Sequence, residues 1–357
     1  MSDAAATKYA GFHLANLIAE VLSGSWRQTP APLDLSPREL DFVMPSLLRS
    51  GAAALAWWRL RLSDSRPLEE SSELQQAYRL HALQALRNER DLSQVLELFR
   101  AIDVEPILVK GWAVARLYPE TGLRPYGDLD LCVHTDDYDR ARTMLRSDEG
   151  RYYNVDLHRG FGRLGHESWE EMKSRSLRLS INRADVRVLC PEDHLRILCF
   201  HFLREGAWRP LWLCDIAVAL ESRAADFDWE LCLGQDRKRW RWFACVIALS
   251  HLLLKTRIEN VPPEVINLQL PRWFLPCVLR EWETPTMPRR HLAPMTTAWR
   301  APVKSVKGLR FHWPNAIEGT IGARGAFNEL PRLPFQLSSC FVRALNFFRR
   351  LPETLGT

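Results

Sequence analysis

The sequence lacks the cysteine pattern of a zinc or disulfide protein. Its eight cysteines include no C-x-x-C pair, and most of them lie inside apolar runs such as Leu198-Cys199-Phe200. Closely spaced cysteine pairs are typical of zinc sites and redox motifs, and disulfide frameworks are typical of small secreted domains. The pattern therefore indicates buried, reduced thiols.

Long apolar runs are also missing. The longest, Phe243 to Leu254, is interrupted by Ser250 and His251 and is too short to span a bilayer. The first residues, MSDAAATKYAGFH, do not have the basic start and apolar core of an export signal. We therefore expect no membrane partner and a cytoplasmic location.

Glycine is scarce relative to proline, at 17 against 22 residues, which favours a helical protein with firm breaks between helices. The 357 residues are 46% hydrophobic and 25% charged, which excludes intrinsic disorder and fibrous repeats. The net charge of +5 is concentrated after residue 299, where basic residues outnumber acidic ones by nine to three. Such a region suits either an anionic partner or an ordinary solvated surface.

Hydrophobic periodicity divides the chain into four regions. They are a helical N-terminal region, an α/β core, a second helical region and a basic, proline-punctuated C-terminal region, at 1–102, 103–190, 191–284 and 285–357. The helices predicted from apolar spacing lie at 42–62, 74–102, 210–222, 229–256, 262–268, 271–283 and 341–350. Residues 63–71 are the predicted linker between the first two.

The α/β core alternates between strand and helix patterns. Val104 to Val109 is a short β-type run, and its Pro106 predicts an edge strand or an entry segment. The clearest strand is Asp128 to Val133, in which apolar and acidic residues alternate. Thr135 is the predicted N-cap of the helix that follows. Further strands are predicted at 153–158 and 186–189.

Acidic side chains on two of these strands carry the chemical signal. Asp128 and Asp130 lie on one face of a strand, with Cα atoms about 6.6 Å apart, and Asp156 lies on the next strand. Carboxylates confined together raise one another's pKa unless a cation compensates them. Mg²⁺ or Mn²⁺ suits such oxygen ligands, and a third carboxylate allows two ions. The alternative reading is a plain solvated strand face.

A predicted phosphate seat precedes these carboxylates. Lys110 and Gly111 stand between a strand and a helix, where glycine allows close approach of the backbone and lysine meets an anion. Arg124, four residues before Asp128, can reach a phosphate oxygen through its guanidinium fork. The ordered set K-G, R-P-Y-G-D-L-D-L and V-D-L-H is more specific than any of its parts.

This ordered set resembles the uncharacterised nucleotidyltransferase family of the DNA-polymerase-β-like superfamily. The similarity extends over most of the chain and is strongest from 107 to 133. It implies an α+β fold with a small mixed β-sheet core flanked by extensive N- and C-terminal helices. It also implies a metal-dependent enzyme that transfers a nucleoside monophosphate from a nucleoside triphosphate, such as ATP, to an acceptor and releases pyrophosphate.

The resemblance also implies residue roles. Asp128, Asp130 and Asp156 would be catalytic ligands of two Mg²⁺ ions, with Mn²⁺ as the alternative, and Asp156 would help to deprotonate the acceptor. The triphosphate would be held by Lys110, Gly111 and Arg124. Lys110-Gly111 replaces the glycine-serine pair of the wider superfamily, and the bulky Trp112 that follows predicts an altered nucleotide pocket.

The acceptor stays open at this stage. It could be a small molecule, a peptide, or RNA as in toxin-like RNA nucleotidyltransferases. A rival from another class is a non-catalytic accessory or scaffold protein that retains the fold, although three retained carboxylates argue against a decayed site.

Other polar residues have mainly structural explanations. His158 shares a face with Asp156 and could orient it, contact substrate, or be an ordinary strand histidine. A buried polar network between helices is expected for His194, His201 and Asp215. The run from Arg237 to Trp242 predicts the start of an amphipathic helix rather than a nucleic-acid surface. Gly319, Gly322 and Gly325 are a weak phosphate motif, because no strong strand precedes them.

Overall fold

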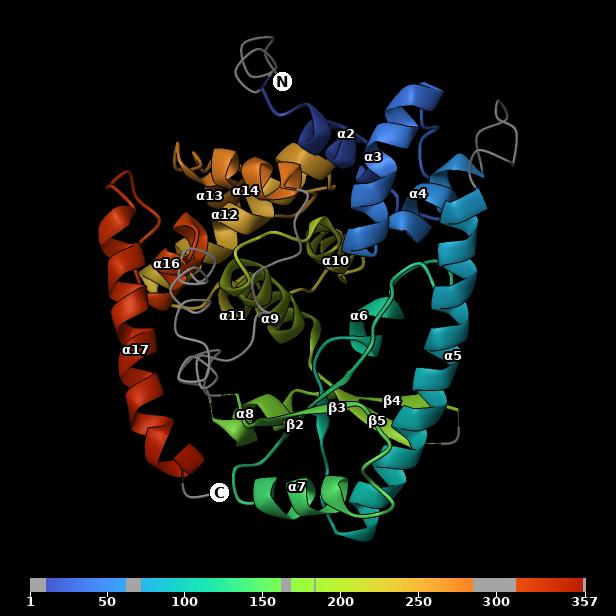
Figure 1. The fold of residues 1–357 in the computed structure, drawn as a ribbon, viewed down its shortest axis with the longest axis vertical. Coiled ribbons are helices and arrows are strands. Elements are labelled where there is room, and N and C mark those ends of the chain that lie inside the picture. The colour runs from blue at the N-terminus through green and yellow to red at the C-terminus, as the bar shows by residue number, and fades with distance from the viewer. Residues whose placement is uncertain (1–10, 62–71, 162–167, 183, 285–312, 356–357) are drawn as a thin grey trace.

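A computed structural model of the chain describes residues 11–61, 72–161, 168–182, 184–284 and 313–355. A body of helices stands above a small β-sheet, and the long helix α5 runs from one to the other (Figure 1). The predicted α+β class is confirmed. Within this described part, no helix combines the length and hydropathy that a bilayer crossing requires. The eight cysteines are unpaired thiols, as predicted.

The N-terminal region is helical, as predicted, but its first long helix is broken. The helices are α2 (His13–Leu22), α3 (Pro37–Ser50), α4 (Ala53–Leu60) and α5 (Ser72–Ala101). Ser36 begins α3 with a capping box to Glu39, and Gly51 ends it with a left-handed φ of 74°. That glycine therefore divides the predicted helix at 42–62 into two. The predicted linker at 63–71 falls outside the described residues.

The helices after the sheet are α9 (Pro191–Arg204), α10 (Pro210–Glu221), α11 (Trp229–Leu233), α12 (Arg237–Leu254), α13 (Pro263–Ile266), α14 (Phe274–Glu283), α16 (Ala316–Gly322) and α17 (Leu333–Leu355). The predicted helix at 229–256 is interrupted, because Gly234 has a φ of 69° and Asp236 caps a new helix. The last helix begins earlier than predicted.

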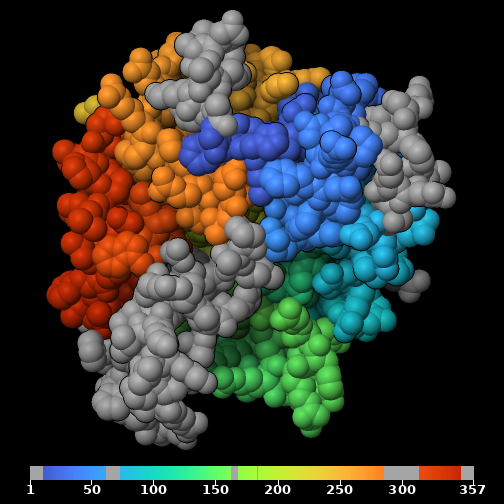
Figure 2. Space-filling view, turned by 45° about the horizontal axis from the view of Figure 1, so that its top comes forward, coloured from blue at the N-terminus to red at the C-terminus, as the bar shows by residue number. Residues whose placement is uncertain are grey.

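One hydrophobic core joins the helices from both ends of the chain. Val21 and Leu22 of α2 belong to the same buried cluster as Phe243 of α12 and Val278 of α14. The blue and orange helices accordingly lie side by side, and the green α/β part forms a lower lobe (Figure 2). The predicted boundaries at 103, 191 and 285 stay predictions, and the first part of the C-terminal region lies outside the described residues.

The sheet has five strands in the order β3-β2-β1-β5-β4. They are β1 (Ile107–Leu108), β2 (Leu129–Val133), β3 (Val155–Arg159), β4 (Leu177–Ile181) and β5 (Ala184–Val188). β2 pairs parallel with β3 and antiparallel with β1, so the sheet is mixed. Of the two alternatives predicted from Pro106, the edge strand is wrong, because β1 is central in the sheet. Pro106 lies in the segment that leads into β1, which is the other alternative.

Helices cover both faces of the sheet, and the acidic residue Asp130 lies on one of these faces. On one face, Leu131 and Val133 pack with Val95 of α5, beside α7 (Tyr138–Arg146). On the other, Cys132 packs with residues of α8 (Trp169–Ser174) and α9. Strand alternation places Asp130 on this second face. The predicted N-cap Thr135 is wrong, since α7 begins after Asp137.

Candidate active site

Two carboxylates stand side by side on neighbouring strands. The parallel register of β2 and β3 pairs Asp130 with Asp156 and Cys132 with His158. Paired residues on adjacent strands project to the same face, and residues two apart share that face. The structure therefore brings Asp156 beside the D-x-D strand, as the sequence predicted, and adds His158 one pleat further along.

Cationic groups lie between these carboxylates. Lys110 Nζ is 2.5 Å from Asp130 Oδ1, and His158 Nε2 is 3.2 Å from both Asp130 Oδ1 and Asp156 Oδ2. Asp130 is only 4% exposed. Among the described residues, Asp130, Asp156 and His158 each offer a ligand atom within 4.8 Å of the others. These three side chains could hold one metal ion.

The pKa values follow from this arrangement. Burial alone would raise the pKa of Asp130, but the hydrogen bond with His158 and the nearby Lys110 outweigh it and lower that pKa. The hydrogen bond with His158 also lowers the pKa of Asp156. The hydrogen bonds that His158 makes with Asp130 and Asp156 in turn raise the pKa of His158 to about 9. The pKa of Asp128 is raised by desolvation and by the charge of Asp130.

A pocket of about 410 Å³ opens beside the carboxylates. Its walls come from the Lys110-Gly111 turn, the loop 124–128, Asp130, and residues of α5, α9 and α10. Asp128 is exposed and lines this pocket, but it is not part of the compact group formed by Asp130, Asp156 and His158. Whether Asp128 ligates a metal stays a prediction.

Gly111 is required by the shape of the turn that carries Lys110. Its φ of 51° and ψ of −114° form a conformation that side chains disfavour. A Cβ added there would lie 3.4 Å from the backbone oxygen of Asp128, which is an ordinary contact. The positive φ, and not crowding, therefore favours glycine at this turn.

Arg124 lines the pocket but is already paired. Its Nε and Nη2 donate to the carboxylate of Asp215 at 3.1 Å and 2.8 Å, and Tyr118 donates to the same carboxylate at 2.9 Å. All three side chains are buried. This pairing holds the loop 124–128 against α10, and the predicted phosphate contact of Arg124 stays a prediction.

Arg209 is a pocket cation that the sequence analysis missed. It stands just before α10, and its Nε donates to the Ser50 carbonyl at 2.6 Å. Its guanidinium lies 5.7 Å from the Trp212 ring centroid, and among the described residues no carboxylate forms an ion pair with it. Burial and the neighbouring Arg124 lower the pKa of Arg209 to about 10. No local motif marks this residue, because only the fold brings it to the pocket.

A family comparison covers this site. Residues 47–256 match the family described as an uncharacterised nucleotidyltransferase, which is more than half of the chain and includes the whole sheet. The chain belongs to this nucleotidyltransferase family. No curated protein and no solved structure gives a match. The resemblance inferred from the K-G, D-L-D-L and V-D-L-H segments is therefore confirmed.

The side chains at this site suit a divalent cation. Lys110 forms an ion pair with Asp130, and His158 pairs with both Asp130 and Asp156. The negative charge of these two carboxylates therefore attracts cations to this position. Carboxylate oxygens suit Mg²⁺ or Mn²⁺, and an imidazole ligand suits Mn²⁺ better than Mg²⁺. The residues present therefore fit a divalent metal ion.

Of the other polar residues singled out in the sequence, some belong to the packed interior and one lines the pocket. Asp215 lies in a buried polar network, as predicted. His201 instead lines the pocket and packs edge-on against Trp212, with ring centroids 4.4 Å apart. Gly319 and Gly322 pack closely against side chains of α17, so close helix packing explains these two glycines.

Proposed function

We propose that the protein transfers a nucleoside monophosphate from a nucleoside triphosphate to an acceptor and releases pyrophosphate. The observation that carries this proposal is the pairing of Asp130 with Asp156 across β2 and β3, with Lys110 beside them at the edge of a pocket. Family membership implies a nucleotide substrate. The carboxylates and the pocket supply the charge arrangement that such a substrate needs.

The metal ligands in this proposal are Asp128, Asp130 and Asp156, with His158 orienting the last two through its hydrogen bonds. Two Mg²⁺ ions, or Mn²⁺ in their place, would neutralise the charge that develops on the phosphate oxygens. Lys110 is then released from Asp130 to meet the triphosphate. Because phosphoryl transfer needs little covalent help, positioning and charge account for the catalysis.

The triphosphate would lie in the 410 Å³ pocket, held by Lys110, the backbone at Gly111, and Arg124. Arg209 is added to this set because it is the pocket cation without a carboxylate partner in the described structure. An arginine fork can donate two hydrogen bonds to a phosphate.

In the reaction, an acceptor oxygen forms a bond to the α-phosphorus as the bond between that phosphorus and the pyrophosphate oxygen breaks. The acceptor proton passes to Asp156, which is half-exposed and therefore accessible to an incoming group. Pyrophosphate leaves on the side of Lys110.

Thermal stability with each nucleoside triphosphate, with and without Mg²⁺, tests the proposal. A ligand at about 100 times its Kd adds about 2.7 kcal/mol to the free energy of unfolding. A nucleotidyltransferase should show this stabilisation only when metal and nucleotide are both present. A scaffold protein would show no metal-dependent change, and that result would refute the proposal.

Substitution then tests the assigned carboxylates. Asp130→Asn and Asp156→Asn should each lower turnover at least ~100-fold, because each removes charge stabilisation at the reacting phosphate. Asp130→Asn also leaves Lys110 without its carboxylate partner, so the thermal midpoint of this variant should fall. Asp156→Asn changes a half-exposed side chain, so its stability should remain close to that of the wild type. Asp136→Asn, at an 86% exposed side chain, is the matched control. Near-normal activity in either test variant would contradict the assignment.

A further inference from the structure

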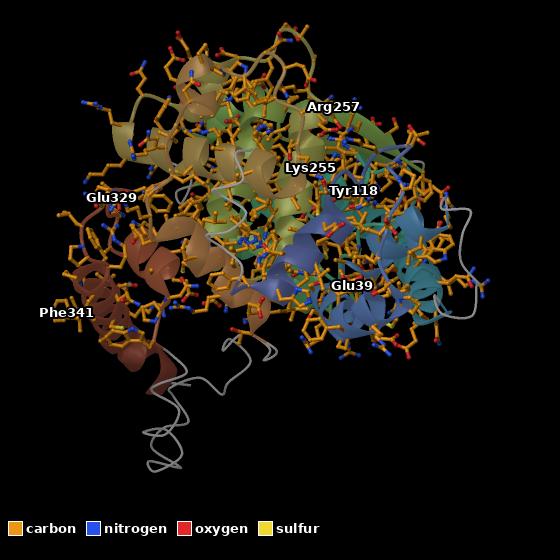
Figure 3. The ribbon with its side chains drawn as sticks, turned by 90° about the horizontal axis from the view of Figure 1, so that it is seen from above. Glu39, Tyr118, Lys255, Arg257, Glu329 and Phe341 are labelled. Carbon is orange, nitrogen blue, oxygen red and sulfur yellow. The ribbon has the colours of Figure 1, made fainter. Side chains whose placement is uncertain are left out.

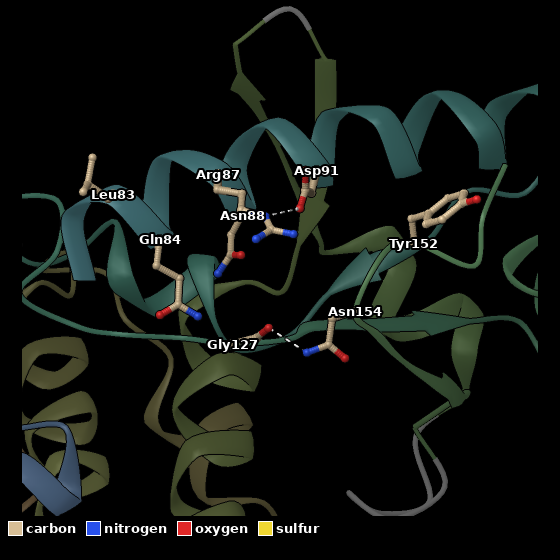
Figure 4. A pocket seen from close by; sticks show the side chains of 8 residues that line it. All are labelled: Leu83, Gln84, Arg87, Asn88, Asp91, Gly127, Tyr152 and Asn154. Carbon is tan, nitrogen blue, oxygen red and sulfur yellow. Dashed lines mark hydrogen bonds and ion pairs between the residues drawn. The ribbon is translucent and has the colours of Figure 1, made fainter. Parts of the chain in front are cut away.

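A second pocket, of about 420 Å³, adjoins the first. Gln84 and Gly127 line both pockets, so the second pocket is a neighbour of the first at the loop 124–128. One wall of the second pocket is α5, and the other is formed by Gly127, Tyr152 and Asn154 at the segments that lead into β2 and β3 (Figure 4). Nothing in the proposed triphosphate site uses this space.

The strand order places the second pocket on the attacking side of the reaction. Lys110 follows β1, Asp130 lies on β2 and Asp156 lies on β3, so the three groups follow one another across the sheet. Asn154 of the second pocket lies just before β3, two residues before Asp156. In-line transfer requires the attacking oxygen opposite the leaving pyrophosphate. With pyrophosphate at Lys110, the acceptor must therefore come from the side of β3.

The lining of this second pocket is polar but carries no net charge. Arg87 Nε lies 3.6 Å from Asp91 Oδ2, one helical turn along α5, and these two are its charged side chains. Asn88 and Asn154 donate to the backbone oxygens of Tyr126 and Gly127 at 2.7 Å and 2.8 Å. Each amide keeps its own oxygen as an acceptor, which suits the hydroxyl groups of a neutral ligand.

Exposed apolar groups stand at both ends of the pocket. Leu83 is 66% exposed and Tyr152 is 70% exposed, so both side chains are accessible to a ligand. Arg151 holds the tyrosine ring in place: its Nη2 donates to the Tyr152 hydroxyl at 2.9 Å, and its guanidinium carbon lies 5.0 Å from the ring centroid. The apolar face of a sugar ring in the ligand could pack on Tyr152.

We propose that the second pocket is the acceptor subsite and that it binds a neutral ring with neighbouring hydroxyl groups, such as a sugar or a ribose. One of these hydroxyl oxygens bonds to the α-phosphorus, its proton passes to Asp156, and pyrophosphate leaves. This inference rests on the proposed function. The ring can belong to a free sugar or nucleoside, or to the 3′-terminal residue of an RNA strand.

Transfer from α-labelled nucleoside triphosphates in the presence of Mg²⁺ tests the inference and separates the two sources. The acceptors are glucose and free ribonucleosides, a short single-stranded RNA, the same RNA after periodate oxidation of its terminal diol, and a peptide containing serine and tyrosine. Label on glucose or a nucleoside identifies a free ring as the source. Label on the intact RNA alone, with none on the oxidised RNA, identifies the strand end.

Substitution of Tyr152 connects the labelled product with the pocket. Tyr152→Ala should raise the KM for the acceptor at least about fivefold by removing the stacking surface, with little change in kcat. Tyr152→Phe keeps the ring and should restore most of the affinity. Phe341→Ala is the matched control, because Phe341 is a similarly exposed aromatic residue on α17, far from Tyr118 beside the first pocket (Figure 3). Stabilisation by Mg²⁺ and nucleotide should be the same in all three variants.

Three results would overturn the inference. They are label on the peptide alone, equal labelling of intact and oxidised RNA, and an unchanged acceptor KM in Tyr152→Ala. If no acceptor is labelled while Mg²⁺ and nucleotide still stabilise the protein, the subsite assignment fails and the proposed function stands. If that stabilisation is also absent, both fail.

Discussion

Replacement of Arg209 by methionine should change stability and nucleotide binding in opposite directions. The guanidinium lies in the pocket without an ion-pair partner among the described residues, and its Nε donates a hydrogen bond to the Ser50 carbonyl. A cation held this way costs the free protein stability, because its lost hydration outweighs the attraction of Asp215 and Asp128. Arg209→Met removes that cost and also removes the proposed phosphate contact.

The structure gives the size of each effect. A pKa lowered from its ordinary value to about 10 means that the fold disfavours the charged Arg209 by about 3 kcal/mol. Arg209→Met also loses the hydrogen bond to Ser50, which offsets about 1–2 kcal/mol of the stability gained by removing the charge. Arg209→Met should therefore be as stable as the wild type or up to about 2 kcal/mol more stable. A lost charge-assisted bond to phosphate, about 1.5–3 kcal/mol, should weaken nucleotide binding about 10- to 100-fold.

Urea unfolding without ligand and calorimetric titration with Mg²⁺ and nucleotide measure the two effects. Arg124→Met is the informative comparison, because it leaves the buried carboxylate of Asp215 unpaired and should cost about 3–5 kcal/mol of stability. The reasoning would be refuted if Arg209→Met were destabilised as strongly as Arg124→Met. Unchanged nucleotide affinity in Arg209→Met would separately remove this residue from the phosphate site.

Two further substitutions test the turn and the helical body. Gly111→Ala should cost about 1–3 kcal/mol of stability, because φ at this glycine is 51°, and it should weaken nucleotide binding. Gly11→Ala, where an added Cβ meets nothing within 4 Å, is the control in the same denaturation assay. Burial and the charge of Arg116 lower the pKa of His194 to about 4, so between pH 6.5 and 4 the unfolded chain binds more protons than the folded one. Stability should therefore fall by about 2–3 kcal/mol as the pH drops from 7.5 to 4.5, and His194→Leu should remove this part of the loss; an equal loss in the variant would contradict a buried neutral histidine.

Periodicity predicted most elements of the fold, but not where glycine or proline breaks them. The pattern at 74–102 became the single helix α5 because no glycine or proline interrupts it. Gly51 and Gly234 ended helices because each adopts a positive φ, which the chain pattern does not reveal. The strand β4 (Leu177–Ile181) was missed, since its alternation is weak and its pairing partner β5 comes after it in sequence.

The sequence predicted the parts of the site that adjacent motifs carry. The D-x-D strand and Asp156 come together because β2 and β3 pair in register, an arrangement that the two V-D-L and D-L-D patterns suggest. The partner of Arg124 could not be predicted, because Asp215 lies on a helix far along the chain. Arg209 reaches the pocket for the same reason, through packing between α10 and the N-terminal helices. Long-range packing, not local propensity, decides both contacts.

The core that joins α2 with α12 and α14 affects how the chain can fold as it leaves the ribosome. Helices α2 to α5 pack against one another, but α2 also packs against α12 and α14, which are synthesised after the entire sheet. Part of the apolar surface of α2 therefore stays uncovered until Phe243 and Val278 emerge. Early N-terminal intermediates of this chain would accordingly be prone to aggregate and would depend on chaperone protection during synthesis.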